Sequence, residues 1–388
     1  MPRVQPTARL VSRRYLEGLV RRSALVGAAL WLTACSRPSS PIVIGLAGPF
    51  SDPGGTSMLR GAQLAVAQIN AQGGVRGRPL KLRIADDSGS EDQAVRVAEQ
   101  LYADPALVAV VGHLSSDASR AAAEVYGSGP SPLVTISPSA SSPELSGLNP
   151  YFFRVCPSAS THGPRLARFA REVLGARRAG IIYTNNDYGR GLRRAFAGEF
   201  TRLGGVVVEA DPEVAATPSL EPYLSRMRRA GVDVLMLASE RPGAELALRE
   251  MSKLGIRWSV LGGDALAGIE AAGAIAEGIH LSSAYLPGRR DSRNATFVAD
   301  YARAYRGQRP DHRGAGAYDV VLLLARAVDE AGPERRAIRD YLAQVGRGKA
   351  PLEGVTGTIE FDANGDIPAK PVVIGVVRGG RFVSERER

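Results

Sequence analysis

From residue 42 onwards, short apolar runs alternate with longer amphipathic stretches. The runs at 42–46, 80–85 and 107–111 are rich in aliphatic and β-branched residues and are followed by Gly or polar residues, which is typical of buried strands. Between them, 58–70 and 91–102 repeat apolar residues at helical spacing. Strands that alternate with helices of this length predict a parallel sheet with right-handed crossovers.

A similar alternation restarts after residue 155, so the sequence predicts two α/β units in tandem, arranged as two lobes. The later elements that we predict are strands at 179–183, 206–209, 232–237, 258–262, 355–361 and 372–377, and helices at 163–174, 220–229, 297–305 and 317–328, with two more helices that begin at Asn185 and Ser239. Asn364-Gly365 lies between the last two strands and predicts a hairpin turn there.

Two serine-rich segments follow neighbouring predicted strands. Ser115-Ser116-Asp117 comes after 107–111, and residues 137–142 come after the strand at 133–136. Ligands of open α/β sheets bind outside the carboxyl ends of the strands, where hydroxyls and helix N–H groups suit a small anion such as a carboxylate. One such cluster more often makes turns and caps helices, but two on neighbouring strands favour a binding site.

The composition excludes some classes of function but does not identify one. The chain has 388 residues, of which 44% are hydrophobic and 23% are charged, and this is long enough for two domains. The formal charge is +10, but residues 1–34 hold six Arg and one Glu, so the remainder carries only +5. Because those basic residues are spread over predicted helices without interleaved aromatics, we expect no nucleic-acid partner.

The first residues have the pattern of a secretory signal. Arg21-Arg22 precede the apolar run 24–32, which is too short to span a membrane and leads into Leu32-Thr33-Ala34-Cys35. This tetrapeptide resembles the lipobox of bacterial lipoproteins. The resemblance implies that 1–34 is a signal peptide, that Cys35 is lipidated, and that 35–41 is a tether. Arg13-Arg14 leaves a twin-arginine export route open.

No common catalytic motif is present. The sequence contains no GxGxxG after a strand, no phosphate-binding loop, no GxSxG, no HExxH and no CxxC, and its four histidines lack metal-ligand spacing. Cys156 is expected to be a small buried hydrophobe. His113 lies near Ser116, which raises the possibility of a hydrolase, but a structural role for His113 fits its place after a strand better. We therefore expect a protein that is not an enzyme and has neither cofactor nor metal.

Several stretches, in this order, resemble the leucine/isoleucine/valine-binding family of substrate-binding proteins for ABC transporters. They include IGLAGPFSDPGG, VVGHLSSDAS, ISPSASSPEL, NNDYGRGL, LGGDAL and GVTGTIEFDANGDI, and the similarity runs from Ile42 to Phe382. The resemblance implies an α/β fold of the type I periplasmic binding proteins, with two Rossmann-like lobes of parallel sheet joined by a three-stranded hinge. The implied limits are 41–157 plus 284–366 for lobe 1 and 158–283 plus 367–388 for lobe 2, with crossings near 154–158, 282–286 and 365–370.

The same resemblance assigns a pocket between the lobes. The implied ligand-binding residues are Leu114, Ser115, Ser116, Ser139, Ser141, Tyr188, Glu240 and Asp264. Serines of the two loops hold the α-carboxylate and contact the α-ammonium, Tyr188 covers the ligand, and Asp264 accepts the ammonium. Glu240 stands where branched-chain binders carry an aromatic, and the loop 51–57 has no aromatic. These departures predict a ligand more polar than leucine.

The function that these observations favour is an extracytoplasmic solute-binding lipoprotein. It is expected to be a monomer that its lipid holds at a bacterial membrane. The protein would deliver an amino acid or similar small molecule to an ABC permease. Three alternatives remain open: a ligand sensor with the same fold that controls a receptor or regulator, a lipoprotein scaffold with a degenerate pocket, and a hydrolase around Ser116 and His113.

Overall fold

Five parallel strands form the first sheet of the computed structural model, which describes residue 2 and residues 40–214 and 216–385. The predicted signal peptide, Cys35 and the tether as far as residue 39 lie outside the described residues. The strands pair in the order β2-β1-β3-β4-β5. They are β1 (Ile42–Gly48), β2 (Leu80–Asp86), β3 (Leu107–Val111), β4 (Val134–Ser137) and β5 (Phe152–Arg154).

Burial explains why these runs become strands. Every residue of β3 and β4 is buried, as expected for the centre of a parallel sheet that helices cover on both faces. The helices of this half that connect its strands are α2 (Pro53–Ala71), α3 (Glu91–Ala103), α4 (Ser116–Tyr126) and the short η1 (Pro143–Leu145). On α3, Ala94, Val97 and Leu101 are buried, so the periodicity seen in the sequence marks its core face.

The second sheet has seven strands in the order β14-β13-β10-β9-β8-β6-β7. They are β6 (Arg178–Thr184), β7 (Val206–Glu213), β8 (Val234–Ala238), β9 (Ser259–Gly262), β10 (His280–Ser283), β13 (Val373–Arg378) and β14 (Arg381–Ser384). The first five are parallel, and β13 and β14 add antiparallel pairs at one edge. The accompanying helices are α5 (Ala159–Arg168), η2 (Phe169–Val173), α6 (Asp187–Arg202), α7 (Glu221–Arg229), α8 (Arg241–Lys253), η3 (Asp264–Leu266) and η4 (Ile269–Ala276).

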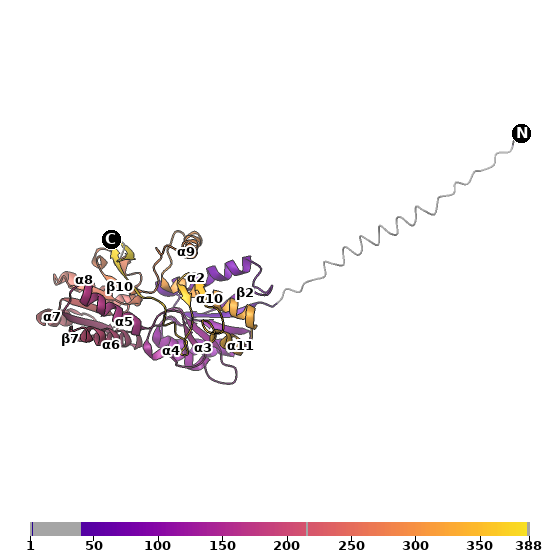
Figure 1. Cartoon of the computed structure of the whole chain (residues 1–388), viewed down its shortest axis with the longest axis horizontal. Coiled ribbons are helices and arrows are strands. Elements are labelled where there is room, and N and C mark those ends of the chain that lie inside the picture. The colour runs from indigo at the N-terminus through magenta and orange to yellow at the C-terminus, as the bar shows by residue number, and fades with distance from the viewer. Residues whose placement is uncertain (1, 3–39, 215, 386–388) are drawn as a thin grey trace. The chain divides into compact units, whose positions relative to one another are not determined.

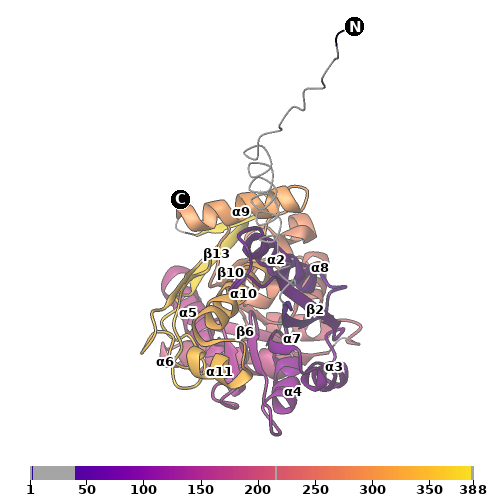
Figure 2. The ribbon, with the colours of Figure 1, turned by 90° about the vertical axis from the view of Figure 1, so that its right-hand side faces the viewer.

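The chain passes between the two sheets three times. It leaves the first sheet after β5 and returns after β10 to build α9 (Ser292–Ala304), α10 (His312–Ala331) and α11 (Arg335–Leu342). The hairpin of β11 (Leu352–Gly354) and β12 (Gly357–Ile359) follows, and the last passage leads to β13. Although it is far away in the sequence, α10 packs beside α2 in the first half (Figures 1 and 2). The fold is therefore two α/β lobes, as predicted, while the exact lobe limits stay predictions.

Three predicted details differ from the structure. Asn364-Gly365 does not join a hairpin, because β12 pairs with β11 and β13 pairs with β10. Instead, Asp362 Oδ1 accepts hydrogen bonds from the backbone N–H groups of Asn364 and Asp366, which fixes a local turn. The helix predicted at 317–328 begins five residues earlier because Asp311 caps it, and the strand predicted at 355–361 is shortened to β12 of a small hairpin.

Within residues 40–214 and 216–385, no helix is both long enough and apolar enough to cross a membrane. Each lobe is stabilised by a large hydrophobic cluster of its own. Ile44, Val111 and Leu324 belong to the cluster of the first lobe, and Leu237 and Leu266 belong to that of the second. These rigid cores place the loops at the carboxyl ends of the strands.

Candidate functional site

The two serine loops lie side by side because β3 and β4 are parallel neighbours. Ser115 Oγ accepts a hydrogen bond from Ala118 N at 3.3 Å and so caps α4. Ser116 is buried, and its Oγ accepts from Ser142 N at 3.1 Å, which joins one loop to the other. Leu114, which precedes them, is partly buried against the apolar core of this lobe. The predicted serines are therefore brought together, although Ser115 acts mainly as a cap.

The second serine loop reaches toward the other lobe. The backbone carbonyl of Ser141 accepts from Ala159 N, at the start of α5, at 2.7 Å. Its side chain is buried, yet Ser141 Oγ has no hydrogen-bond partner within the described part of the chain. Ser139 Oγ lies 3.2 Å from His312 Nε2. A buried hydroxyl without a partner is costly in a folded protein, so Ser141 stays a candidate for contact with a ligand.

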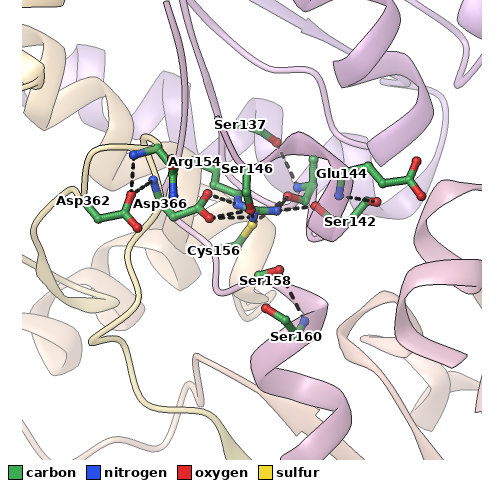
Figure 3. A network of polar contacts seen from close by, with 12 residues as sticks. Ser137, Ser142, Glu144, Ser146, Arg154, Cys156, Ser158, Ser160, Asp362 and Asp366 are labelled. Carbon is green, nitrogen blue, oxygen red and sulfur yellow. Dashed lines mark hydrogen bonds and ion pairs between the residues drawn. The ribbon is translucent and has the colours of Figure 1, made fainter. Parts of the chain in front are cut away.

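A buried arginine supports this loop from behind. Figure 3 shows Arg154 of β5 at the centre of a network, where its guanidinium donates to the backbone carbonyls of Ala140 at 3.2 Å and Ser142 at 2.7 Å. On its other side, Arg154 binds the Asp366 carboxylate at 2.6 Å. The sequence analysis did not single out Arg154, because a lone arginine at a strand end carries no motif. It holds the serine loop in place.

From the second lobe, Tyr188 and Asp264 meet each other. Tyr188 is buried at the start of α6, and its hydroxyl accepts from Ala265 N at 3.3 Å. Burial, and then the nearby Asp264 charge, hold the pKa of Tyr188 well above its ordinary value. A methyl group on Gly263 would lie 2.2 Å from the Tyr188 hydroxyl oxygen, so glycine permits this close approach. Asp264 is 5% exposed, and its Oδ1 lacks a partner among the described residues.

Two histidines, which the sequence analysis set aside, complete this centre. His162 and His312 line a small cavity together with Asp264, Pro138 and Cys156. His162 Nδ1 lies 2.9 Å from Ser282 Oγ, and Nε2 lies 3.9 Å from Asp264 Oδ2. Burial lowers the pKa of both histidines, for His312 to about 4. They come from helices far apart in the sequence, so no spacing rule could have found them.

Glu240 is the N-cap residue of α8 and lies two positions after the last residue of β8. Its Oε1 accepts from Asn186 Nδ2 at 3.0 Å, which places it beside the start of α6. The residue as a whole is exposed, but desolvation of its carboxyl end, and then the charges of Asp117 and Glu213, raise its pKa. Glu240 therefore lies beside the start of α6 in its own lobe, and it has no hydrogen bond to Tyr188 or Asp264 in the described structure.

An arginine of the first lobe reaches across to the second. Arg313, in the first turn of α10, donates to the carbonyl of Ala265 at 2.9 Å. It also pairs with Asp311 at 3.0 Å. Its side chain is 11% exposed and packs against Gly54, which was predicted to lie in a loop at 51–57 but belongs to the first turn of α2. Sequence reasoning missed Arg313 because it started this helix too late.

Beside this centre is a larger cavity of about 750 Å³. Tyr285 and His312 line both cavities, so the two are adjacent. Arg60, Arg289 and Arg309 are among the residues that line the larger one. None of the predicted site residues lines it, but its position leaves room for a ligand group that extends beyond His312.

Contacts between charged side chains also join the two lobes at the other rim. Arg120 of α4 binds the Asp187 carboxylate of α6 at 2.7 Å, and Asp117 Oδ1 accepts from Asp187 N at 3.0 Å. Arg194 pairs with Glu144 at 2.6 Å on the surface. The two lobes therefore touch in this structure. Of the eight predicted pocket residues, Asp264 is the one that lines either of the two cavities described above.

The hydrolase hypothesis is not supported by the position of His113. Its Nδ1 lies 2.6 Å from Asp87 Oδ2 and its Nε2 lies 3.2 Å from the Tyr126 hydroxyl, so both ring nitrogens are engaged away from Ser116. A general base must reach the proton that it removes. Among the described residues, no group of three or more His, Cys, Asp or Glu side chains is arranged to hold a metal ion.

Comparisons with known proteins agree with this geometry. The chain is 27% identical to a leucine-, isoleucine-, valine-, threonine- and alanine-binding protein of Pseudomonas aeruginosa, over 86% of this chain and 88% of the relative. An ABC transporter substrate-binding protein of Desulfitobacterium hafniense, solved in complex with leucine, is 31% identical with a TM-score of 0.76 and coverage of 89% and 99%. A branched-chain amino acid transporter substrate-binding protein of Streptococcus pneumoniae, solved with isoleucine, is 26% identical with a TM-score of 0.80 and coverage of 88% and 97%.

The family comparison covers nearly the whole described chain. The model of the family described as periplasmic binding protein matches residues 41–381. Together with the two lobes, this match confirms the resemblance found in the sequence. The chain belongs to the periplasmic binding protein family, the family of the leucine/isoleucine/valine-binding proteins that it resembles.

Proposed function

We propose that this protein binds an amino acid between its two lobes and delivers it to an ABC permease. The observation that supports this most directly is a pair of buried groups without partners, one on each lobe. Ser141 Oγ offers a donor and Asp264 Oδ1 offers a charged acceptor, and neither has a partner within residues 40–214 and 216–385. A zwitterion supplies the complement of both.

The chemistry of each end is simple. The α-carboxylate is bound by Ser141 and Ser116 near the N-terminus of α4, whose dipole favours an anion. The α-ammonium is bound by Asp264, with Tyr188 packed over it. Hydrogen bonds to charged groups contribute roughly 1.5–3 kcal/mol each. Four such bonds, after ordering costs, correspond to affinity in the micromolar range or tighter, about −8 kcal/mol.

The place of the protein in the cell follows from its relatives and its first residues. The similar proteins are solute-binding components of transporters, so transport is favoured over the ligand-sensor alternative and over catalysis. We propose an extracytoplasmic monomer that is attached to the membrane through lipidated Cys35, outside the described residues. The permease would recognise the form in which the lobes have closed.

The identity of the amino acid is the more specific part of the proposal. In this proposal the charged side chains of Glu240, which accepts from Asn186, and of Arg313, which donates to the Ala265 carbonyl, lie beside the ligand side chain. Residues 51–57, which form the start of α2 from Pro53 onwards, include no aromatic side chain. We therefore propose a ligand more polar than leucine, although similar proteins have been solved with leucine and isoleucine.

The test is a binding screen of the purified protein against the twenty L-amino acids, by thermal shift and then calorimetry. At least one should stabilise the protein in a concentration-dependent way, as mass action requires. Asp264→Asn should weaken that amino acid by about 2–4 kcal/mol, because it leaves the ammonium without its counter-charge. Ser141→Ala should cost about 1 kcal/mol.

Two surface variants serve as controls for these substitutions. Asp329→Asn and Ser160→Ala change the same residue types at exposed positions and should leave the affinity unchanged. If no amino acid binds the wild type, the proposed function is wrong. If leucine binds far more tightly than every polar amino acid, the proposed ligand class is wrong while the function stands.

A further inference from the structure

We propose that His162 is a second acceptor for the ligand's ammonium group, so that the site selects an ammonium over a hydroxyl group. This inference rests on the proposed function and names the part of the ligand that His162 contacts. His162 is 1% exposed, and its Nε2 lacks a hydrogen-bond partner among the described residues. Such a buried nitrogen needs a partner that this chain does not provide.

The geometry places His162 and Asp264 around one small space. Their nearest atoms, Nε2 and Oδ2, are 3.9 Å apart, which is too far for a direct hydrogen bond. A nitrogen about 2.9 Å from both atoms would bond to both at ordinary lengths. Both side chains line the same small cavity.

The protonation of His162 suits this role. Its Nδ1 lies 2.9 Å from Ser282 Oγ, and Ser282 is fully buried. When Nδ1–H donates to this hydroxyl, Nε2 is left with its lone pair exposed to the cavity. Burial lowers the pKa of His162, and the Arg154 charge adds to this while Asp264 opposes it, so a neutral imidazole is favoured.

Two acceptors on one side favour an ammonium over a hydroxyl group. A primary ammonium has three N–H groups and can donate to Asp264 and to His162 at once. The hydroxyl group that replaces it in a 2-hydroxy acid is uncharged and has a single O–H, so it leaves one of the two acceptors without a partner. An unpaired buried group is penalised, and the site should therefore discriminate strongly against such analogues.

Two substitutions of His162 show whether it acts by accepting a hydrogen bond or only by filling space. His162→Leu removes the acceptor, whereas His162→Gln keeps an oxygen at nearly the same reach. His280→Gln, on β10 of the same lobe and outside both cavities, is the matched control. The probes are L-leucine and every other L-amino acid that stabilises the wild type in the screen above, each beside its 2-hydroxy acid.

The expected result is a change of selectivity and not only of affinity. His162→Leu should weaken the amino acid by roughly tenfold to a hundredfold but weaken the 2-hydroxy acid much less, so the ratio of the two dissociation constants falls. His162→Gln should restore most of that ratio, and His280→Gln should not change it. Melting temperature shows that each variant is folded.

Three outcomes would decide against the proposal. If His162→Leu binds amino acids as the wild type does, His162 does not contact the ammonium, and the proposed function still stands. If both ligands weaken equally, His162 acts only through packing. If no amino acid binds the wild type, the proposed function is wrong and this inference is wrong with it.

Discussion

Single side chains in the cleft matter because they are buried and incompletely paired. The sequence could place Ser141, Tyr188 and Asp264 near a common edge, since strand ends and a family resemblance both point there. It could not find His162, because the contact of its Nε2 with the Asp264 region depends on how α5 packs against β10. Tertiary packing of this kind leaves no local signal.

His312 provides a prediction at this scale, because the folded protein keeps it neutral. Burial, and then the Arg313 charge, lower its pKa from 6.5 to about 4. Between these values the unfolded chain binds a proton that the folded chain does not, so stability falls as the pH drops from about 6.5 to about 4, by about 3 kcal/mol in total.

His312→Gln should remove this part of the acid sensitivity. Chemical denaturation of wild type and variant at pH 8, 6, 5 and 4 measures it, and the two stability curves should run parallel above pH 7 and separate below it. Curves that stay parallel down to pH 4 would contradict the prediction.

At the scale of elements, the amphipathic pattern predicted most helices and strands, and its errors lie at their ends and in the elements that it missed. Helix α10 begins at His312 because Asp311 caps it, where apolar periodicity alone suggested residue 317. Strand β14 and helix α11 were not predicted, and β12 pairs with β11 instead of β13. A cap made by a side chain, or a strand that joins an existing edge, depends on partners that hydrophobic periodicity does not describe.

Asp311 is the element-scale prediction. Its Oδ1 accepts from Ser57 Oγ at 2.6 Å and from Gly314 N at 3.0 Å, and so joins α2 to the start of α10. Burial alone would raise the pKa of Asp311, but the nearby charge of Arg313 helps to hold it below its ordinary value. Asp311→Ala should reduce the free energy of unfolding by about 2 kcal/mol or more, through the lost cap and the lost charged contacts.

The cap of α9 offers a matched comparison. Asp291 Oδ1 accepts from Asn294 N at 2.8 Å and caps a helix that carries none of the predicted ligand-binding residues. Asp291→Ala should lower stability in urea denaturation by about 1 kcal/mol and leave amino acid binding intact. Asp311→Ala should reduce both, and an unchanged affinity would show that α10 does not need this cap to shape the cleft.

For the whole molecule, the sequence predicted two lobes because the α/β alternation occurs twice. What it could not show is which surface residues meet across the gap. Arg120 and Asp187 are 67 positions apart and belong to helices of different lobes, yet they bind at 2.7 Å. Such contacts stabilise only arrangements in which the lobes touch, and in the proposed function this is the form that holds the ligand.

Arg120→Ala should therefore weaken amino acid binding by about 0.5–1.5 kcal/mol, or roughly two- to tenfold. Asp187 keeps Arg190 as a partner in the variant, so no buried charge is abandoned. Arg202→Ala is the control, since Arg202 pairs with Glu199 inside α6 and should not affect the dissociation constant. Calorimetry measures both, and equal affinities for wild type and Arg120→Ala would contradict this expectation.

Arg154 has a consequence for attempts to redesign specificity. One guanidinium fixes the loop that carries Ser141 and, through Asp366, the segment by which the chain returns to the second sheet. In the proposed function, the loop that binds the ligand carboxylate and the passage between the lobes therefore share a single support. A designer who wants a new ligand should vary Glu240, which is exposed, and leave Arg154 untouched.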